Sequence, residues 1–184
     1  MDPRALPAPP PQGDPPDDAA FALLRLDAQL CFPLYAASNL VTRAYRPLLE
    51  PLGLTYPQYI ALLALWQAGA LTVRALGERL LLDSGTLSPL LSRLEQRGLV
   101  ARAPHPTDRR QVVIRPTPDG WALRAQAAGV PEALLCRVFG GRPPESAEER
   151  AALVALRGQL QQLVAALQRA VDPVDPLPSP TPLP

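Results

Sequence analysis

Residues 72–116 have the sequence TVRALGERLLLDSGTLSPLLSRLEQRGLVARAPHPTDRRQVVIRP. The first half predicts two short helices, over about 74–80 and 85–96, separated by the polar turn LLDSGT. Asp83 or Ser84 can cap the second helix, because short side chains with oxygen atoms accept hydrogen bonds from the free amides of a first turn. Two short helices joined by such a turn form a helix-turn-helix.

Two β-prone segments follow this helix-turn-helix, Leu99–Arg102 and Gln111–Arg115. The loop between them, APHPTDRR, is rich in proline and arginine. A strand, a basic loop and a second strand directly after a helix-turn-helix are typical of the wing of a winged helix. Because leucine and alanine dominate the rest of the chain, we predict a mainly α-helical protein built around a winged helix-turn-helix.

Positive charge is concentrated in the same stretch. Residues 72–116 contain eight arginines and four acidic residues, a net charge of +4, whereas the whole chain has a net charge of +1. This excess predicts a surface that faces phosphates, with the second helix in the major groove of a DNA duplex. The predicted DNA-binding residues can all donate hydrogen bonds to bases or phosphates: Ser84, Thr86, Ser88, Ser92, Arg93, Arg109 and Arg110. The simpler alternative is a solvated polar face.

Asp108 lies in the basic loop and cannot bind phosphate directly. We therefore expect this carboxylate to bind Arg110 and to shape the wing.

Helical patterns precede the wing. Apolar residues recur at helical spacing from Phe21 to about Tyr45. Pro33 lies inside this run and is expected to remove one backbone hydrogen bond, which predicts a kink or a helix start near Cys31. A capping box at Thr55–Gln58 predicts the start of a further helix, which ends at Gly69.

Helical patterns also follow the wing. Thr117 predicts a cap for a helix that runs from Gly120 to about Phe139, with an interruption at 129–131. A second capping box at Ser146–Glu149 predicts the last helix.

These patterns predict one domain at residues 21–170, with a winged helix at about 55–116. Dimerisation helices are expected at about 21–46 and 117–170, because their apolar faces exceed what one small domain can bury. Residues 1–20 contain seven prolines and residues 171–184 contain six, so we predict a disordered tail at each end.

Several classes of protein are disfavoured by the composition. No run of ~18 apolar residues predicts a membrane span, and the first residues lack the apolar core of a secretory signal, so we expect a cytoplasmic protein. His105 is the only histidine and the two cysteines are 105 residues apart, so neither a metal site nor a cofactor is expected.

Cys31 and Cys136 remain as candidate reactive groups. The residues around Cys31 are apolar and offer no base, so the local sequence alone favours an inert core thiol. Its activation to a thiolate would need a helix N-terminus or hydrogen-bond donors supplied by the fold. Cys136 likewise looks like a core position on a helix.

Three segments change this interpretation. LDAQLCFPLYAASN at 26–39, YRPLLEPLGLTYPQY at 45–59 and GERLLLDSGTLSPLL at 77–91 resemble the organic hydroperoxide-sensing branch of the MarR family, known as OhrR. The similarity covers about 21–170, and it includes the Asp-x-Arg pattern of the MarR wing at Asp108 and Arg110.

The resemblance implies that Cys31 is the thiol that lipophilic hydroperoxides oxidise to a sulfenic acid. It further implies that Tyr45 and Tyr56 of the partner subunit hydrogen-bond the reactive sulfur. Cys136 falls where two-cysteine members of the branch have a second thiol, which forms a disulfide between subunits. The alternative for Cys136 is a buried bystander.

The resulting hypothesis is a redox-sensing repressor and not an enzyme. The reduced homodimer would bind double-stranded operator DNA, and organic hydroperoxides would release it by oxidising Cys31. One alternative is a MarR-type repressor released by a noncovalent aromatic ligand. Another is a thiol peroxidase in which Cys31 turns over substrate, although the chain lacks a CxxC pair and devotes about 45 residues to reading DNA.

Overall fold

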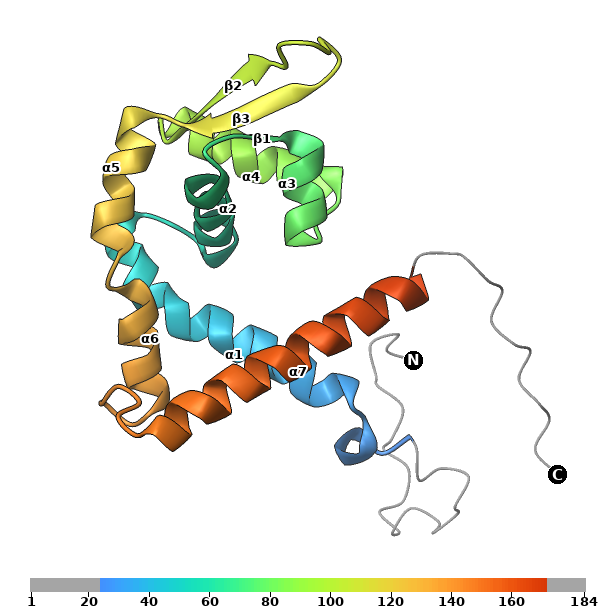
Figure 1. Cartoon of the computed structure of the whole chain (residues 1–184), viewed down its shortest axis with the longest axis vertical. Coiled ribbons are helices and arrows are strands. Elements are labelled where there is room, and N and C mark those ends of the chain that lie inside the picture. The colour runs from blue at the N-terminus through green and yellow to red at the C-terminus, as the bar shows by residue number, and fades with distance from the viewer. Residues whose placement is uncertain (1–23, 172–184) are drawn as a thin grey trace, which may run out of the picture.

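The computed structural model describes residues 24–171, so the predicted tails at 1–20 and 171–184 lie outside it apart from Val171. The described chain is mainly helical with one small sheet, which confirms the predicted fold class. Its elements are, in chain order, η2 (Leu26–Ala28), α1 (Cys31–Leu49), η3 (Glu50–Leu52), α2 (Tyr56–Ala68), β1 (Leu71–Thr72), α3 (Val73–Leu80), α4 (Ser84–Gln96), β2 (Val100–Pro104), β3 (Val112–Pro116), α5 (Pro118–Ala127), α6 (Val130–Val138) and α7 (Ala147–Val171). The sheet lies with α2, α3 and α4 at one end, and α1 and α7 lie at the other (Figure 1).

The winged-helix module, residues 54–116, contains the predicted helix-turn-helix as α3 and α4. Thr72 caps α3, and Asp83 caps α4 as the sequence predicts. The antiparallel sheet has the order β1-β3-β2. The two predicted wing strands are confirmed to within two residues, whereas β1 was not predicted as a strand. A segment of two residues is too short to show the alternation of a strand.

The hydrophobic core of the module lies between α2, α3, α4 and β3. Its largest fully buried side chains include Leu62 and Leu65 of α2, Leu91 and Leu94 of α4, and Ile114 of β3. The predicted capping box at the start of α2 is present: Thr55 accepts from the amide of Gln58, whose side chain accepts from the amide of Thr55. The buried leucines of α4 pack one face of that helix against the core, so the opposite face is exposed to solvent.

α1 begins at Cys31, which confirms a helix start at the predicted place. The expected loss of a hydrogen bond at Pro33 is wrong, because Pro33 is the third residue of the helix and first-turn amides have no helical acceptor. The sequence predicts that the first helix ends near residue 46, and the observed end lies three residues later. α1 continues through Pro47 to Leu49 and is followed by η3 and a left-handed Gly53.

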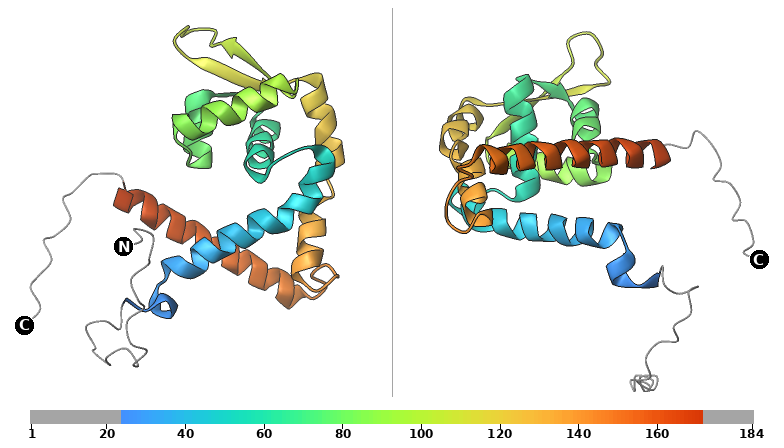
Figure 2. Two further views of the ribbon diagram at one scale, coloured as in Figure 1. Left: turned by 180° about the vertical axis from the view of Figure 1, so that it is seen from behind. Right: turned by 60° about the horizontal axis from the view of Figure 1, so that its bottom comes forward.

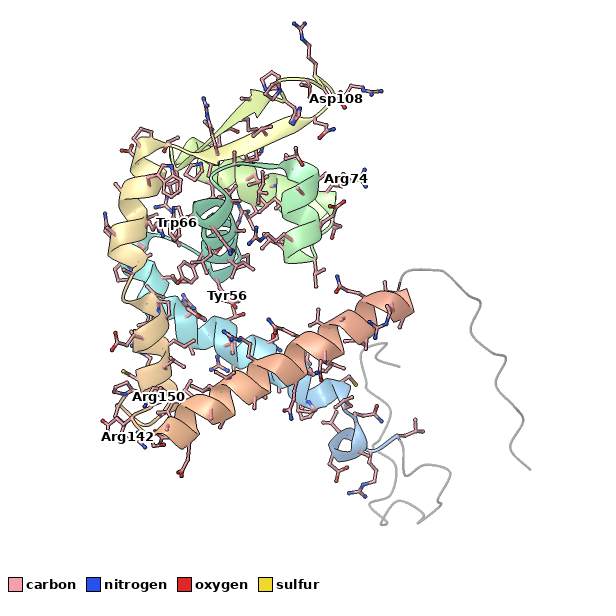
Figure 3. All side chains as sticks on the ribbon, viewed as in Figure 1. Tyr56, Trp66, Arg74, Asp108, Arg142 and Arg150 are labelled. Carbon is pink, nitrogen blue, oxygen red and sulfur yellow. The ribbon has the colours of Figure 1, made fainter. Side chains whose placement is uncertain are left out.

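Gly120 in the first turn of α5 brings that helix against the winged-helix module. A Cβ atom at this position would lie 2.0 Å from the carbonyl oxygen of Leu99, so only glycine permits the approach. The Gly120 carbonyl accepts a hydrogen bond of 2.8 Å from Trp66 Nε1. The side chain of Trp66 lies between α2 and α5 in Figure 3. Through Gly120, the first turn of α5 therefore packs directly against the module, and this contact is the joint between the module and the helices that follow it.

Beyond this joint, α6 continues from α5 after the predicted interruption near Gly129. The second capping box is present at the start of α7, where Glu149 N donates to Ser146 Oγ over 3.0 Å. The views in Figure 2 show α1 and α7 extending as two separate helices in the same general direction from the side of α6. We call α1 and α7 the two arms.

Candidate DNA-binding interface and thiol site

The exposed face of α4 begins at its N-terminus. Asp83 Oδ1 accepts a hydrogen bond of 2.8 Å from Thr86 N, and Oδ2 accepts one of 2.9 Å from Thr86 Oγ1. These donors lower the pKa of Asp83, the backbone amide of Thr86 contributing most. Ser84, Ser88 and Arg93 are exposed on the same helix, as is Thr86. The face thus presents hydroxyls and one guanidinium to a ligand, with the Thr86 hydroxyl already donating within the cap.

Ser92 differs from the other predicted DNA-binding residues of α4. It is half-buried, and its Oγ accepts a hydrogen bond of 3.0 Å from Arg102 Nη2 of β2. Arg102 Nε also lies 2.9 Å from Glu95 Oε2. Ser92 therefore joins α4 to the base of the wing, a contact that the sequence did not predict because it depends on how strand and helix pack.

The wing is organised around Asp108, which lies at the far end of the β2–β3 loop in Figure 3. Asp108 Oδ1 accepts from Arg110 N at 3.1 Å and from Arg110 Nε at 3.3 Å, while Oδ2 accepts from Gln111 Nε2 at 3.1 Å. These bonds lower the pKa of Asp108, that from the Arg110 amide most of all. The carboxylate is therefore charged and folds the loop so that Arg109 and Arg110 remain exposed.

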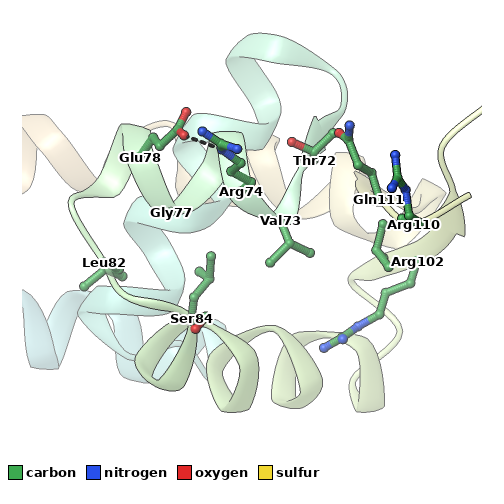
Figure 4. A pocket seen from close by; sticks show the side chains of 12 residues that line it. Thr72, Val73, Arg74, Gly77, Glu78, Leu82, Ser84, Arg102, Arg110 and Gln111 are labelled. Carbon is green, nitrogen blue, oxygen red and sulfur yellow. Dashed lines mark hydrogen bonds and ion pairs between the residues drawn. The ribbon is translucent and has the colours of Figure 1, made fainter. Parts of the chain in front are cut away.

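A cavity of about 660 Å³ separates the wing from α3 and α4 (Figure 4). Three arginines lie along it: Arg74 of α3, Arg102 of β2 and Arg110 of the wing. Arg74 Nε forms an ion pair of 2.8 Å with Glu78 Oε1. Arg74 and Arg102 were missed as site residues. The charge count of residues 72–116 included them, but only the fold places them beside Arg110.

Cys31 is the first residue of α1 and is exposed within one chain. Its Sγ lies 3.9 Å from Gln29 Oε1. The interpretation as a core thiol, drawn from its neighbours in sequence, is therefore wrong for the single chain. Tyr35, one turn further along α1, is also exposed.

Tyr45 and Tyr56 are brought together by the fold. Their rings stack with centroids 4.6 Å apart, and Tyr59 lies 5.7 Å from Tyr45 in a tilted arrangement. Burial, followed by the neighbouring Tyr56 and Tyr59, raises the pKa of Tyr45 to about 12. These phenols are thus neutral hydrogen-bond donors near neutral pH. Tyr59 was not among the predicted residues.

The tyrosines and Cys31 of one chain do not meet. Cys31 and Tyr45 lie on the same straight helix, 14 residues apart, a separation of about 21 Å at 1.5 Å per residue. Cys136 is a half-buried free thiol on α6. α6 lies beside the C-terminal half of α1 in Figure 1, whereas Cys31 is at the opposite end. Contacts of Cys31 with the tyrosines or with Cys136 would therefore require a second chain.

Over residues 24–171, the structure contains no group of histidine, cysteine and acidic side chains that could hold a metal ion. Within the same range, no helix is long and apolar enough to cross a membrane.

The sequence profile described as MarR family matches residues 54–112, which lie in the winged-helix module. The chain is 50% identical over 115 residues to the organic hydroperoxide resistance transcriptional regulator of Bacillus subtilis, covering 62% of this chain and 78% of that protein.

Two solved structures show a similar fold. Reduced AbfR bound to DNA is 36% identical with a TM-score of 0.56, over 77% of this chain and 96% of that one. A cysteine-to-serine mutant of MarR from E. coli, in complex with operator DNA, is 27% identical with a TM-score of 0.62, over 71% and 92% of the two chains.

Proposed function

This chain belongs to the MarR family of DNA-binding transcriptional regulators, in its organic hydroperoxide resistance branch, and on that premise we propose that it is a redox-sensing repressor. The reduced protein would bind operator DNA in the cytoplasm, and organic hydroperoxides would release it. Its role is regulatory and not enzymatic. The observation that carries the proposal is the placement of an exposed Cys31 at one end of α1 and a stacked tyrosine pair near the other.

DNA would be read by α4 and the wing together. Ser84, Thr86 and Ser88 would contact bases or phosphates from the exposed face of α4, and Arg93 can bind guanine through two hydrogen bonds. Arg109 and Arg110 would contact the backbone or the minor groove from the wing that Asp108 shapes. Ser92 would act indirectly, by holding the wing against α4 through Arg102.

The working unit would be a homodimer formed by the two arms. Apolar side chains of α7 recur at helical spacing and are exposed, namely Leu156, Leu160, Val164 and Leu167. α1 likewise exposes Phe32, Leu40 and Val41. A second copy of the chain would cover both faces, and one α4 helix from each copy would enter each half of a pseudo-palindromic operator.

In the dimer, Tyr45 and Tyr56 of one subunit would hydrogen-bond the Cys31 sulfur of the other. The Cys31 thiolate attacks the terminal oxygen of a hydroperoxide ROOH, and the O–O bond breaks. After proton uptake the products are Cys31 sulfenic acid and the alcohol ROH. The neutral phenols would donate to the sulfur and would also hold the peroxide in place.

Cys136 of the opposite subunit would then resolve the sulfenic acid. Its thiolate attacks the Cys31 sulfur, an S–S bond forms, and the sulfenic oxygen leaves as water after protonation. Since Cys136 is half-buried and distant from Cys31 along one chain, this bond requires α1 and α6 of different subunits to approach each other. That movement would change the separation of the two α4 helices and release the DNA.

The decisive experiment is an operator-shift titration with cumene hydroperoxide, using a duplex selected by the reduced protein. Wild type is expected to leave the duplex, and Cys31→Ser to remain bound. Equal release of both proteins would exclude the redox mechanism. On non-reducing gels, oxidised Cys136→Ser should give no covalent dimer, and a persisting dimer would exclude Cys136 as the resolving thiol.

One observation favours a second candidate, release by a noncovalent aromatic ligand. A cavity of about 480 Å³ lies between α1 and the start of α2, lined by residues that include Arg43, Arg46 and Tyr56. An anionic aromatic compound would fit its two arginines. Release of Cys31→Ser by such a compound, with no effect of peroxide on wild type, would favour this candidate.

A further inference from the structure

Two connections join the winged-helix module to the helices outside it. Residues 50–55 lead from α1 into α2, and residues 116–118 lead from β3 into α5. Both connections contact the chain at the C-terminal end of α4. A movement of the outer helices relative to α4 would therefore act on contacts at this end of the helix, in addition to those that α1 and α5 make with α2.

The first connection is held by Arg97, the C-cap residue of α4. Its Nη2 donates a hydrogen bond of 3.0 Å to the carbonyl of Leu52, and its Nη1 donates to the carbonyl of Gly53. The fork of a guanidinium suits two adjacent carbonyls better than a single amine does. Arg97 and these acceptors are 44 and 45 residues apart in sequence, so the contact joins two distant segments.

The turn at Gly53 is shaped to receive this guanidinium. Gly53 has φ +63°, a left-handed conformation that side chains rarely adopt, and a Cβ atom there would lie 2.8 Å from Arg97 Nη2. The turn also closes α1, because Leu54 N donates to the carbonyl of Leu49 over 3.0 Å. The end of α1 and the end of α4 are thus joined through one turn and one side chain.

The second connection is held mainly by the backbone. Thr117 N donates to the carbonyl of Leu99 over 3.1 Å, and Thr117 Oγ1 donates to the carbonyl of Gly98. Gly120 packs directly on Leu99, as described above. The short Thr117 side chain and the close backbone contact at Gly120 allow little relative movement of the two segments. The first connection differs, because it depends on the long side chain of Arg97.

We infer that Arg97 is a positioning residue that transmits a movement of α1 to the recognition helix α4. This inference rests on the proposed function, in which oxidation of Cys31 displaces α1. The displaced turn at Leu52 and Gly53 pulls the end of α4 through Arg97, and α4 loses the orientation that fits the half-site. Without the guanidinium, the buried face of α4 keeps the helix in place while α1 moves.

The test compares operator dissociation constants of the reduced and hydroperoxide-oxidised full-length protein. We expect the ratio of oxidised to reduced dissociation constants to be about fivefold smaller in Arg97→Ala than in wild type. The rate at which Cys31 becomes oxidised, followed by mass spectrometry, should be unchanged. Gln96→Ala alters the neighbouring exposed residue of α4 and should keep the wild-type ratio.

If Arg97→Ala keeps the wild-type ratio of dissociation constants while wild type is released by peroxide, the role of Arg97 is refuted and the proposed function is not affected. Slower oxidation of Cys31 in this variant would overturn that role too, because the effect would then lie at the thiol. If reduced Arg97→Ala fails to bind DNA, Arg97→Lys is tested in its place. The proposed role requires that the ratio of oxidised to reduced dissociation constants in Arg97→Lys lie between the wild-type value and 1. A ratio equal to that of wild type would contradict the role. Failure of wild type to leave the operator would instead refute the proposed function.

Discussion

The winged-helix module and the two arms differ in how their apolar side chains are covered. Nearly all buried hydrophobic residues of the described chain lie between Leu54 and Val130, with Leu49 just before them. None of the residues of α7 is buried, and Leu49 is the one buried residue of α1 among those described. The module therefore holds its own core, whereas the arms carry apolar surface that a second chain would cover.

This comparison predicts that the module determines the free energy of unfolding of one chain, and that the arms determine the affinity between two chains. Mutations in the module should act on unfolding at any protein concentration. Mutations in the arms should act on dimer dissociation, an effect that depends on protein concentration.

The largest effect is expected for Leu91→Ala in α4. Leu91 is fully buried, so its truncation leaves a cavity and should lower the free energy of unfolding by about 4 kcal/mol. Urea unfolding followed by circular dichroism would measure the change. Leu63→Ala in α2 serves as the control, because Leu63 is 41% exposed and should cost below about 1 kcal/mol. Equal losses for the two variants would contradict the assignment of the core.

The next effect concerns the close contact between the module and α5. Gly120→Ala places a Cβ atom 2.0 Å from the Leu99 carbonyl oxygen, so α5 must shift away, at a cost of about 3 kcal/mol. Thermal unfolding would detect the loss. Gly129→Ala is matched to it, because nothing lies within 4 Å of its Cβ position, and it should leave the midpoint nearly unchanged. A Gly120→Ala protein as stable as wild type would refute the close approach.

A smaller effect is expected from the arms. Leu160→Asp puts a charge into the exposed apolar face of α7 and should raise the dimer dissociation constant about tenfold, or about 1.4 kcal/mol. Analytical ultracentrifugation would measure it. Arg157→Ala changes an exposed charged residue of the same helix and should have little effect. Loss of the module's fold in Leu160→Asp, rather than of the dimer, would contradict the comparison.

The smallest effect concerns pH and the start of α7. Arg142 and the backbone amides of Ser146 and Glu145 bind the Glu149 carboxylate and lower its pKa from 4.5 to about 2. Because the folded-state pKa is the lower one, this contribution is present above pH 4.5 and is lost as the pH falls towards 2. The protection of the first-turn amides of α7 against hydrogen exchange, relative to their exchange in the unfolded chain, should therefore fall over that range. Glu149→Gln should show the lower protection already at pH 7, and wild-type protection in that variant would refute the cap.

Most of the winged-helix module could be predicted from the sequence, because its signals are local. The Asp83 cap and the Thr55–Gln58 capping box each depend on residues three positions apart, and the same holds outside the module for the capping box at Ser146–Glu149. The end of α1 could not be placed in this way. A proline disfavours the interior of a helix, yet α1 continues through Pro47 to Leu49, and it packs against α2 and α6, which are distant in sequence or formed later in the chain.

Only part of the residue set of the candidate site was predictable from the sequence, and its arrangement was not. Charge and helix position identified Arg93, Arg109 and Arg110, whose side chains are exposed. The engagement of Ser92 by Arg102 depends on tertiary packing, and so does the position of Tyr59 beside Tyr45. The exposure of Cys31 could not be read from its apolar neighbours, because α1 buries so little of itself within one chain.

The length of α1 has a genetic consequence. If Cys31 of one subunit works with Tyr45 of the other, each sensing site is built from two polypeptide chains, and a dimer contains two such sites. A cell that produces Cys31→Ser and Tyr45→Phe chains together would form mixed dimers in which one site lacks both groups and the other is intact. Two alleles that are each defective would then partly complement one another, with at most half of the sites restored.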